Sequence, residues 1–531
     1  MEKLAGKVML LWGGRKALLT LGAGAVGALA LAPFDIFATM FVAFTLLVWI
    51  MDGTASEPDA GWFSRIWPAF LTGWLFGFGY FAAGLWWLGN ALLEDGAEFA
   101  WAIPLASLGL PFVLAVFYGL ATVVARLLWS NGPGRITALA LGFGLAEWLR
   151  SFVLTGFPWN AIGYAAMPVP LLMQPAHILG IAGMNILAVF VFSVPALLGT
   201  RRGAVPGLLL AALLIVADLG YGFWMLGKAP DADAKEVSVR IVQPMSGLES
   251  DISDAERAAL FEDLIKLGGM PPKSGDRPPQ LIVWPETSIP FILSQNQSAF
   301  TRIDEMLGDG QVLVAGAVRA EDSAPGTPHR YYNSVYAFGS DGEIIGAADK
   351  VHLVPFGEYL PFEDFLKNIG LETIAANASG GYSAATRHTV LTLPGIGSVY
   401  PLICYEAIFP TEIDEEGETA ADVLLNVTND TWFGYTPGPY QHFQAARITA
   451  VEVGKPMIRA ADSGISAIID PQGRIISGAG LQTKGVVDAT LRFGSVATWS
   501  KSARNINFWL LCVISLIAAS FSRFSFVSDY N

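Results

Sequence analysis

The chain has 531 residues, of which 53% are hydrophobic and only 15% are charged, and its mean hydropathy is +0.48. This composition excludes an ordinary soluble globular protein, in which about 25% of the residues are charged. The formal net charge is −14, and the sequence has no basic stripe, zinc-ligand spacing or phosphate-binding glycine loop. It therefore predicts no nucleic-acid partner, no metal and no cofactor.

Apolar stretches of near-membrane length recur along the chain. A helix needs roughly 20 apolar residues to cross a bilayer core about 30 Å thick. The first two stretches are short and are separated by the break Ala-Pro-Phe-Asp at 32–35, which favours a tight helical hairpin. We predict an α-helical membrane bundle of about eight spans: 16–32, 36–51, 68–89, 101–128, 136–153, 171–199, 205–226 and 506–524.

A long polar segment lies between the seventh and eighth spans. Charged helices, alternating strands and Pro/Gly turns begin near Asp231 and continue to about residue 504, enough chain for one domain of about 270 residues. The sequence therefore predicts three parts: a seven-span bundle at 1–228, a soluble domain at 229–504 and a final transmembrane helix at 505–531.

The basic residues of the membrane part orient the chain, because Lys and Arg accumulate in short cytoplasmic loops. Alternate connections and both ends of the chain carry them, at Lys3, Lys7, Arg15, Lys16, Arg65, Arg126, Arg135, Arg201, Arg202 and Arg523. The intervening loops carry acidic residues or no charge, apart from Arg150, one helical turn from Glu147. This pattern predicts cytoplasmic termini and an exported, periplasmic 229–504 domain.

A cleavable signal peptide is the alternative interpretation of the first 32 residues. Ala-Leu-Ala at 30–32 is typical of a cleavage site, but Pro33 follows directly and disfavours cleavage. The later spans keep their orientation under either interpretation.

One of the two cysteines ends a strand of the exported domain. Cys404 follows the apolar run at 398–403, whereas Cys512 lies in the last span and is no partner for it. Structural cysteines in an oxidising compartment usually come in pairs. Cys404 alone is more simply interpreted as a small buried hydrophobe, although a strand end is also where α/β folds tend to place reactive groups.

Two other apolar strands of this domain also end in charged residues. The predicted strand at 280–288 carries Glu286 just after Pro285, and the segment 343–359 carries Lys350 and then Glu358 on a Pro/Gly loop. Each of these charges alone is best interpreted as a solvated loop residue. Together with Cys404 they favour a reactive site, because a thiol of pKa near 8.5 needs a neighbouring base or cation to become a nucleophile.

The motifs around these residues resemble a known family. Trp-Pro-Glu at 284–286, Lys-Val-His-Leu-Val-Pro-Phe-Gly-Glu-Tyr at 350–359 and Cys-Tyr-Glu at 404–406 resemble the Glu–Lys–Cys motifs of the nitrilase (carbon-nitrogen hydrolase) superfamily. The segments 429–434 and 456–474, with the surrounding spans, resemble the membrane-embedded lipoprotein N-acyltransferases of that superfamily. The resemblance extends over nearly the whole chain.

The resemblance implies an α/β nitrilase-like αββα sandwich for the exported domain. The sequence is compatible with it, since helical stretches at 254–267 and 439–454 alternate with strands at 312–318, 333–338, 422–427 and 465–470. The loop 245–253 departs from the family, because it lacks the tryptophan expected there. Any substrate contact that the family assigns to this loop is in doubt for this chain.

The resemblance also implies a reaction, in which a fatty acyl chain passes from a phospholipid to a lipoprotein through a cysteine thioester. Cys404 would be the nucleophile, Glu286 the general base and Lys350 an oxyanion donor together with the backbone N–H of Tyr405. Glu358 would orient Lys350 or relay the proton. Glu406 is interpreted as a residue that fixes the loop.

The same resemblance implies the partners and the location. The expected donor is a phospholipid, with phosphatidylethanolamine favoured, and the expected acceptor is the N-terminal diacylglyceryl-cysteine of a lipoprotein. The protein is expected to act as a monomer in the bacterial inner membrane. A membrane-anchored amidase would use the same three residues and stays open, as does an inactive binding protein with a nitrilase-like receptor domain.

Four further residues stand out in the sequence. Trp432 and Phe433 are predicted substrate-binding residues on an amphipathic arm, with packing in the domain core as the alternative. His352 is assigned to packing or a loop hydrogen bond, because it has no second ligand or base partner nearby in the sequence. Asp218, inside the seventh span, marks a polar contact or a functional site.

Overall fold

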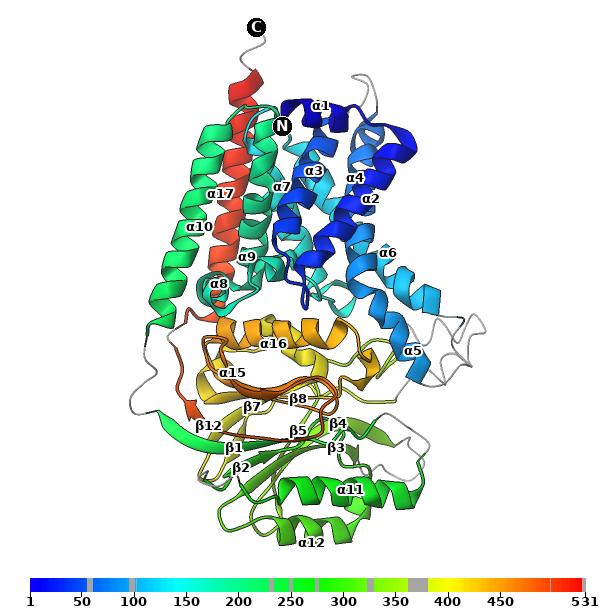
Figure 1. Ribbon diagram of the computed structural model, residues 1–531, viewed down its shortest axis with the longest axis vertical. Helices are drawn as coiled ribbons and strands as arrows, with labels where there is room; N and C mark the ends of the chain where they lie inside the picture. Colours follow the sequence, from blue (N-terminus) through cyan, green and yellow to red (C-terminus); the bar gives the residue numbers. More distant parts are fainter. Residues whose placement is uncertain are drawn as a thin grey trace. The chain divides into compact units, whose positions relative to one another are not determined.

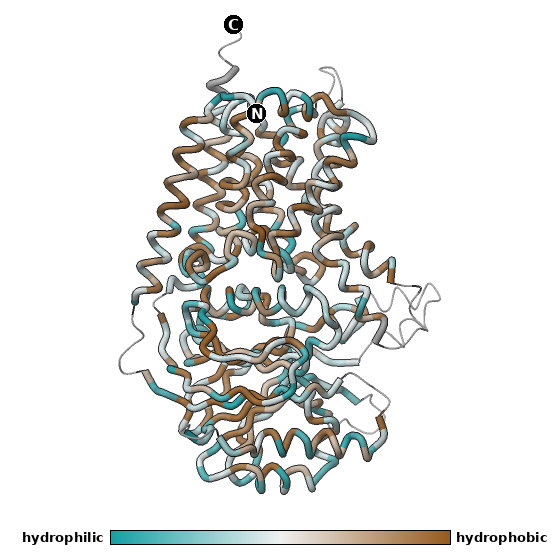
Figure 2. The backbone as a smooth tube through the Cα atoms, in the orientation of Figure 1, coloured by the Kyte–Doolittle hydropathy of each residue, from teal (hydrophilic) through white to brown (hydrophobic). Residues whose placement is uncertain are grey.

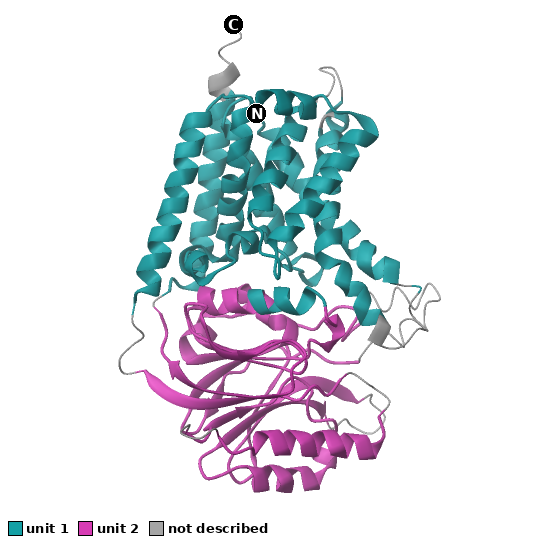
Figure 3. Ribbon diagram, in the orientation of Figure 1, with its two compact units in different colours: residues 1–228, 436–444, 498–531 teal, residues 229–435, 445–497 magenta. Residues whose placement is uncertain are grey.

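The computed structural model describes residues 1–54, 61–94, 101, 103–228, 234–247, 252–272, 277–321, 329–361, 381–496 and 498–527. The chain divides into two compact units (Figure 3). The first comprises Met1–Lys228, Thr436–Gln444 and Thr498–Asn531, and the second comprises Ala229–Tyr435 and Ala445–Ala497. Three parts of the predictions lie outside the described residues: the domain start at 229, residues 95–100 between the third and fourth predicted spans, and residues 248–251 of the 245–253 loop.

The first unit is built from helices whose residues are largely apolar (Figures 1 and 2). Short 3₁₀ turns connect several of them, and one follows α2 just before the predicted break at 32–35. The helices are α1 (Glu2–Met9), α2 (Gly13–Gly27), α3 (Ala38–Asp52), α4 (Trp62–Leu85), α5 (Ala91–Glu94), α6 (Ile103–Leu127), α7 (Gly134–Arg150), α8 (Pro170–Met173), α9 (Ala176–Ser193), α10 (Ala204–Leu226) and α17 (Lys501–Val527).

Each of the eight predicted spans overlaps at least one helix of this unit. Within the described part of the chain, five helices are long and apolar enough to cross a membrane: 62–90, 103–127, 176–199, 204–226 and 501–523. The other three, α2, α3 and α7, have 15, 15 and 17 residues. Helices α3 and α7 nevertheless pack as core helices, because α3 buries nine residues and α7 buries thirteen. The chain is therefore a multi-pass membrane protein.

The second unit contains two six-stranded sheets. In the first sheet the strands lie in the order β12 (Gly485–Phe493), β1 (Lys235–Gln243), β2 (Leu281–Val283), β3 (Val312–Glu321), β4 (Arg330–Phe338) and β5 (Ile344–Asp349). In the second sheet the order is β11 (Ile475–Ala479), β10 (Ser466–Ile469), β9 (Met457–Ala461), β8 (Val423–Thr428), β7 (Gly397–Ile403) and β6 (Leu391–Leu393).

Helices cover the outer faces of the two sheets, which pack against each other (Figure 1). Helices α11 (Asp254–Gly268) and α12 (Gln297–Met306) lie on the first sheet and share an apolar core with β2, β3 and β4 that surrounds the fully buried Trp284. Helix α15 (Glu415–Ala420) and residues 445–453 of α16 (Gly438–Val453) lie on the second sheet. The predicted αββα sandwich is confirmed.

Strand direction brings several strand ends to one rim of the sandwich. Strands β1, β2 and β3 run parallel, and β5 runs in the same direction because β4 is antiparallel to both β3 and β5. In the second sheet β7, β8 and β9 are parallel. Carboxyl ends of parallel strands meet at the same edge of a sheet, which is where α/β folds place their sites.

Candidate active site

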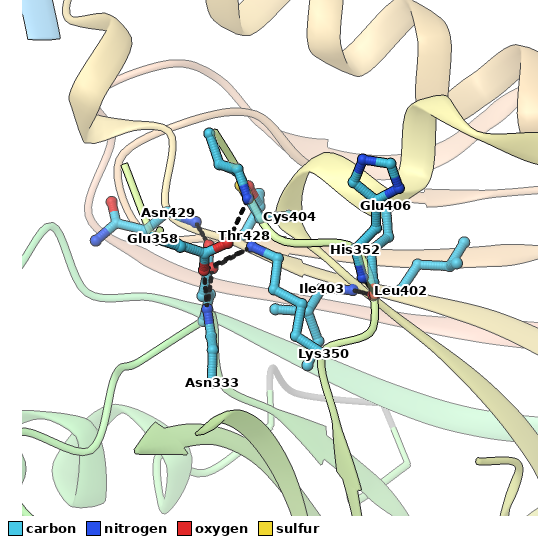
Figure 4. Close-up of polar contacts among 12 residues, drawn as sticks. Asn333, Lys350, His352, Glu358, Leu402, Ile403, Cys404, Glu406, Thr428 and Asn429 are labelled. Carbon is cyan, nitrogen blue, oxygen red and sulfur yellow. Dashed lines mark hydrogen bonds and ion pairs between the residues drawn. The ribbon is translucent and has the colours of Figure 1, made fainter. Parts of the chain in front are cut away.

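The predicted catalytic residues lie within three residues of strand ends at this rim. Glu286 comes three residues after β2, where Thr287 has a positive φ of 45°. Lys350 directly follows β5, and Cys404 directly follows β7 as the first residue of a short 3₁₀ helix, η8 (Cys404–Ile408). The structure brings Lys350, Glu358 and Cys404 together (Figure 4). Glu286 joins them through its contact with Lys350.

An ammonium group lies between two carboxylates at the centre of the cluster. Lys350 Nζ is 2.9 Å from Glu358 Oε1 and 3.5 Å from Glu286 Oε1. All three side chains are buried, with Lys350 only 1% exposed. A buried charge is tolerated only when it is paired and hydrogen-bonded, so these three groups depend on one another.

Neutral donors complete the hydrogen bonding of the two carboxylates. Asn333 Nδ2, from β4, donates to Glu286 Oε1 at 2.7 Å and to Glu358 Oε1 at 2.9 Å. The remaining oxygens accept backbone N–H bonds of 2.8 Å, Glu286 Oε2 from Asn429 and Glu358 Oε2 from Val354. Both carboxylates are thus held at each of their oxygens, which fixes their orientation.

Burial and neighbouring charges set the proton affinities of these groups. Burial raises the pKa of Glu286, Lys350 opposes that rise, and the nearby Glu358 carboxylate adds to it. For Lys350, burial acts to lower the pKa, but Glu358 and Glu286 outweigh burial and raise it above its usual range. Lys350 therefore stays protonated, while Glu286 is a stronger base than an exposed glutamate.

Cys404 lies beside this cluster with a strained backbone. Its φ is 53°, in the left-handed region that non-glycine residues rarely adopt, and its side chain is buried. Such strain is typical of functional sites, where the surrounding structure imposes the conformation. Burial raises the pKa of the Cys404 thiol, the Glu286 carboxylate raises it further, and Lys350 acts in the opposite direction. The resting sulfur is therefore protonated.

A second polar layer supports Cys404 from β8 and β9. Asn426 Nδ2 donates to the carbonyl oxygens of Leu402 at 2.8 Å and Cys404 at 3.3 Å. The amide oxygen of Asn426 accepts a hydrogen bond from the fully buried Arg459, which also forms a 2.7 Å ion pair with Asp430. This network fixes the carbonyl groups on both sides of the turn that presents the thiol.

Glu406 joins the two loops that carry Lys350 and Cys404. Its Oε1 accepts backbone N–H bonds from Val351 at 2.7 Å and His352 at 3.0 Å, and its Oε2 accepts from Ile403 at 2.6 Å. With three such bonds, this buried carboxylate is committed to backbone contacts.

The Tyr405 side chain belongs to an aromatic group behind η8. It packs edge-on against Phe409 at 4.8 Å, and His352 stacks on Phe409 at 4.1 Å while its Nδ1 lies 2.7 Å from Glu412. His352 therefore has both the packing and the loop hydrogen bond assigned to it. The Thr449 hydroxyl of α16 donates to the Ala407 carbonyl at 2.7 Å and fixes η8 from the other side.

Trp432 and Phe433 lie on η10 (Thr431–Phe433), close in sequence to Asn429. Trp432 is 42% exposed, whereas Phe433 is half-buried. The turn is tied to its surroundings by Thr431, whose hydroxyl lies 2.7 Å from Ser463 Oγ and donates to Asp462 at 3.3 Å.

Asp462 also holds the described start of the 245–253 loop. Its Oδ1 accepts from the Ser246 hydroxyl at 2.6 Å and from the Ser246 backbone N–H at 3.1 Å. Through Asp462, the loop that lacks the expected tryptophan is connected to the Trp432 turn.

Reasoning from the sequence alone missed several residues of the site. Asn333 and Asn426 lie in predicted strands and Arg459 lies in the segment 456–474, but none of them was predicted as a site residue. Asn426 and Arg459 each interrupt an apolar run, and that interruption was the available signal, because a buried polar group needs a partner. Within the described residues, no group of three or more His, Cys, Asp or Glu side chains is arranged to hold a metal ion. In α10, Asp218 Oδ1 has no hydrogen-bond partner among the described residues.

Comparison with known proteins identifies the family. Residues 239–501 match the carbon-nitrogen hydrolase family, and residues 23–194 match the apolipoprotein N-acyltransferase N-terminal domain. Apolipoprotein N-acyltransferases of Rhizobium rhizogenes and Rhizobium leguminosarum bv. trifolii are 57% and 58% identical to this chain, each match covering 100% of both chains. Saccharomyces cerevisiae Nit3, a nitrilase-superfamily member, matches 50% of this chain and 93% of its own length at 19% identity, with a TM-score of 0.36. Because the similarity to the bacterial relatives is full-length, the chain belongs to the apolipoprotein N-acyltransferase family, the enzymes that N-acylate lipoproteins.

Proposed function

We propose that this acyltransferase works by a two-step transfer through a thioester on Cys404. The donor is a phospholipid, such as phosphatidylethanolamine, and the acceptor is the N-terminal diacylglyceryl-cysteine of a lipoprotein. The observation that carries the proposal is the buried Glu286–Lys350–Glu358 cluster beside the buried Cys404 thiol. That arrangement suits acyl transfer, which needs a base, a fixed positive charge and a nucleophile.

In the first step Cys404 attacks the ester carbonyl while Glu286 takes the thiol proton. The carbonyl oxygen becomes an oxyanion, stabilised by the Lys350 ammonium and the Tyr405 backbone N–H. Collapse of the intermediate breaks the ester C–O bond, and the lysophospholipid leaves as an alcohol with the proton from Glu286. A positioned base contributes about 10² to 10⁴ in rate, and one oxyanion donor about 10² to 10³.

In the second step the α-amine of the lipoprotein attacks the thioester carbonyl. Glu286 accepts a proton from the amine, the C–S bond breaks, and the proton returns to the sulfur to regenerate Cys404. The product is an amide, which is much less reactive toward nucleophiles than the thioester. Glu358 keeps Lys350 oriented, a role supported by the 2.9 Å contact between them.

Other residues are assigned supporting roles. Glu406 holds the Lys350 and Cys404 loops together, and its three backbone hydrogen bonds support this assignment. Trp432, with its exposed ring, and Phe433 contact the lipid parts of the substrates.

The domain plan and orientation follow from the same reaction. Residues 1–228 form seven spans, 229–504 the periplasmic catalytic domain and 505–531 the last span, with both termini cytoplasmic. Extracting a 16-carbon chain from the bilayer would cost on the order of 12 kcal/mol, at about 0.8 kcal/mol per CH₂. The apolar helices support a site that receives its chains from the membrane of a bacterial cell.

The test uses the purified full-length protein with phosphatidylethanolamine and a synthetic diacylated lipopeptide. We expect N-acylated lipopeptide and lysophospholipid in equal amounts. Release of free fatty acid without N-acylated peptide would show an amidase-type hydrolase and contradict the proposal. The Cys404→Ala variant is the control for uncatalysed transfer.

A further inference from the structure

A single amide group joins the two carboxylates of the site. Asn333 lies on β4, is 2% exposed, and donates through Nδ2 to both Glu286 Oε1 and Glu358 Oε1. Ionised carboxylates only accept hydrogen bonds, so the nitrogen of the amide must face them. Lys350 Nζ contacts the same two oxygens. Asn333 is therefore an uncharged donor that binds the same carboxylates as the ammonium, and Figure 4 shows it beside Lys350 and Glu358.

The amide is needed because the cluster has more negative than positive charge. One nitrogen bonds both oxygens, so the two carboxylates are less than about 6 Å apart and repel each other. Lys350 supplies one positive charge for two negative ones and is closer to Glu358 than to Glu286. Glu286 thus depends more on its neutral donors, Asn333 and the Asn429 N–H.

The other end of the Asn333 side chain points to the same conclusion. Among the described residues, the buried Oδ1 atom has no hydrogen-bond partner. An unpaired buried carbonyl oxygen is unfavourable. An apolar side chain would fill the same space without this cost. The polar side chain is accounted for by its contacts with the two carboxylates.

We infer that Asn333 is a positioning residue, which keeps Glu286 ionised and aimed as the base for both transfer steps. In the part of the chain that the structure describes, the charged and titratable groups that face Glu286 are Lys350, Glu358, Cys404 and Tyr382. Among these, only Lys350 favours the ionised form by its charge. Loss of the Asn333 donor therefore favours protonation of Glu286.

This inference rests on the proposed function for its first readout, the rate of Cys404 acylation against pH. The measurement uses full-length protein in mixed micelles with phosphatidylethanolamine, and intact mass reports the adduct. In Asn333→Leu, we expect the acidic limb of the profile to move up by about one pH unit, and the rate near neutral pH to fall at least about tenfold. Asn333→Asp should be at least as impaired, because its carboxylate adds a third negative charge.

The second readout needs no turnover. A hydrophobic carbodiimide modifies protonated buried carboxyls, and peptide mapping follows its reaction with Glu286 across the same pH range. We expect labelling of Glu286 in Asn333→Leu to persist to higher pH than in the wild type. If the wild type forms no acyl adduct, the proposed function fails, and this labelling profile still decides the role of Asn333.

The control variant is Ser334→Ala on the same strand, whose hydroxyl bonds Asp349 at 2.6 Å and does not contact Glu286. It should keep the wild-type profiles. If folded Asn333→Leu, or Asn333→Asp when the leucine variant does not fold, has wild-type acylation and labelling profiles, the inference is overturned.

Discussion

At the scale of single residues, the chemistry depends on how Cys404 loses its proton. Burial and the neighbouring Glu286 carboxylate keep the proton on the sulfur at rest. Many reactive cysteines instead hold a ready thiolate, stabilised by a nearby cation. Here the nucleophile must form during attack, so that Glu286 becomes as important as the sulfur itself.

The pH dependence of Cys404 acylation follows from the state of Glu286. Its pKa is raised, chiefly by burial, above the usual glutamate value near 4.3. As the pH falls through the raised pKa, Glu286 becomes protonated and can no longer accept the thiol proton. We therefore expect the rate of Cys404 acylation to fall on the acidic limb of its pH profile. The rate is measured with phosphatidylethanolamine as donor, and intact-protein mass spectrometry reports the adduct.

The variant Glu286→Gln removes the base at every pH and serves as the reference. It should be slower than the wild type by about 10² to 10⁴ and lose the acidic limb. An unchanged limb in Glu286→Gln would assign that titration to a different group.

At the scale of elements, the site depends on loops that are fixed to one another. Glu406 accepts hydrogen bonds from the backbone of the Lys350 loop and from the last residue of β7. It therefore fixes the position of Lys350, from the first sheet, relative to Cys404, from the second. A glutamine at this position can accept with only one of its two polar atoms. Glu406→Gln should therefore loosen both loops.

We expect faster amide hydrogen exchange at Val351, His352 and Ile403 in Glu406→Gln, and a stability loss of about 1 to 3 kcal/mol. The rate of Cys404 acylation should fall, but the acidic limb of its pH profile should remain at the wild-type pH. The matched control is Glu412→Gln, which alters the contact with the His352 ring and leaves the three backbone hydrogen bonds of Glu406 in place. Unchanged exchange at the three amides in Glu406→Gln would contradict this role.

The elements themselves were largely predictable from the sequence, since apolar periodicity and turn residues placed β3, β4, β7, β8, α11 and α16 within a few residues. The strand at 280–288 was predicted too long, because β2 ends at Val283 before Pro285, which lacks a backbone N–H. Asn333 and Asp462 could not be assigned, because their partners come from distant strands and loops. Sequence spacing shows which residues end strands, but not which side chains hydrogen-bond across them.

At the scale of the whole molecule, hydropathy and charge made the membrane bundle predictable. The orientation is a separate statement that rests on the distribution of Lys and Arg. It can be tested in Cys404→Ala, where the remaining Cys512 is buried. Ser298→Cys places a thiol at the exposed start of α12, and Lys3→Cys places one at the N-terminus.

A membrane-impermeant maleimide on intact spheroplasts should label Ser298→Cys at once. Lys3→Cys should be labelled only after permeabilisation, because the N-terminus is expected in the cytoplasm. The reverse result would place the catalytic domain inside the cell and remove the orientation argument.

The central claim is that Cys404 carries the acyl chain between the two substrates. Mass spectrometry of the full-length protein, incubated with phosphatidylethanolamine and no acceptor, tests this claim most directly. We expect one fatty acyl group on Cys404, absent from Cys404→Ala and removed when the diacylated lipopeptide is added. Absence of an adduct on the wild type, or an equal adduct on Cys404→Ala, would contradict the thioester mechanism.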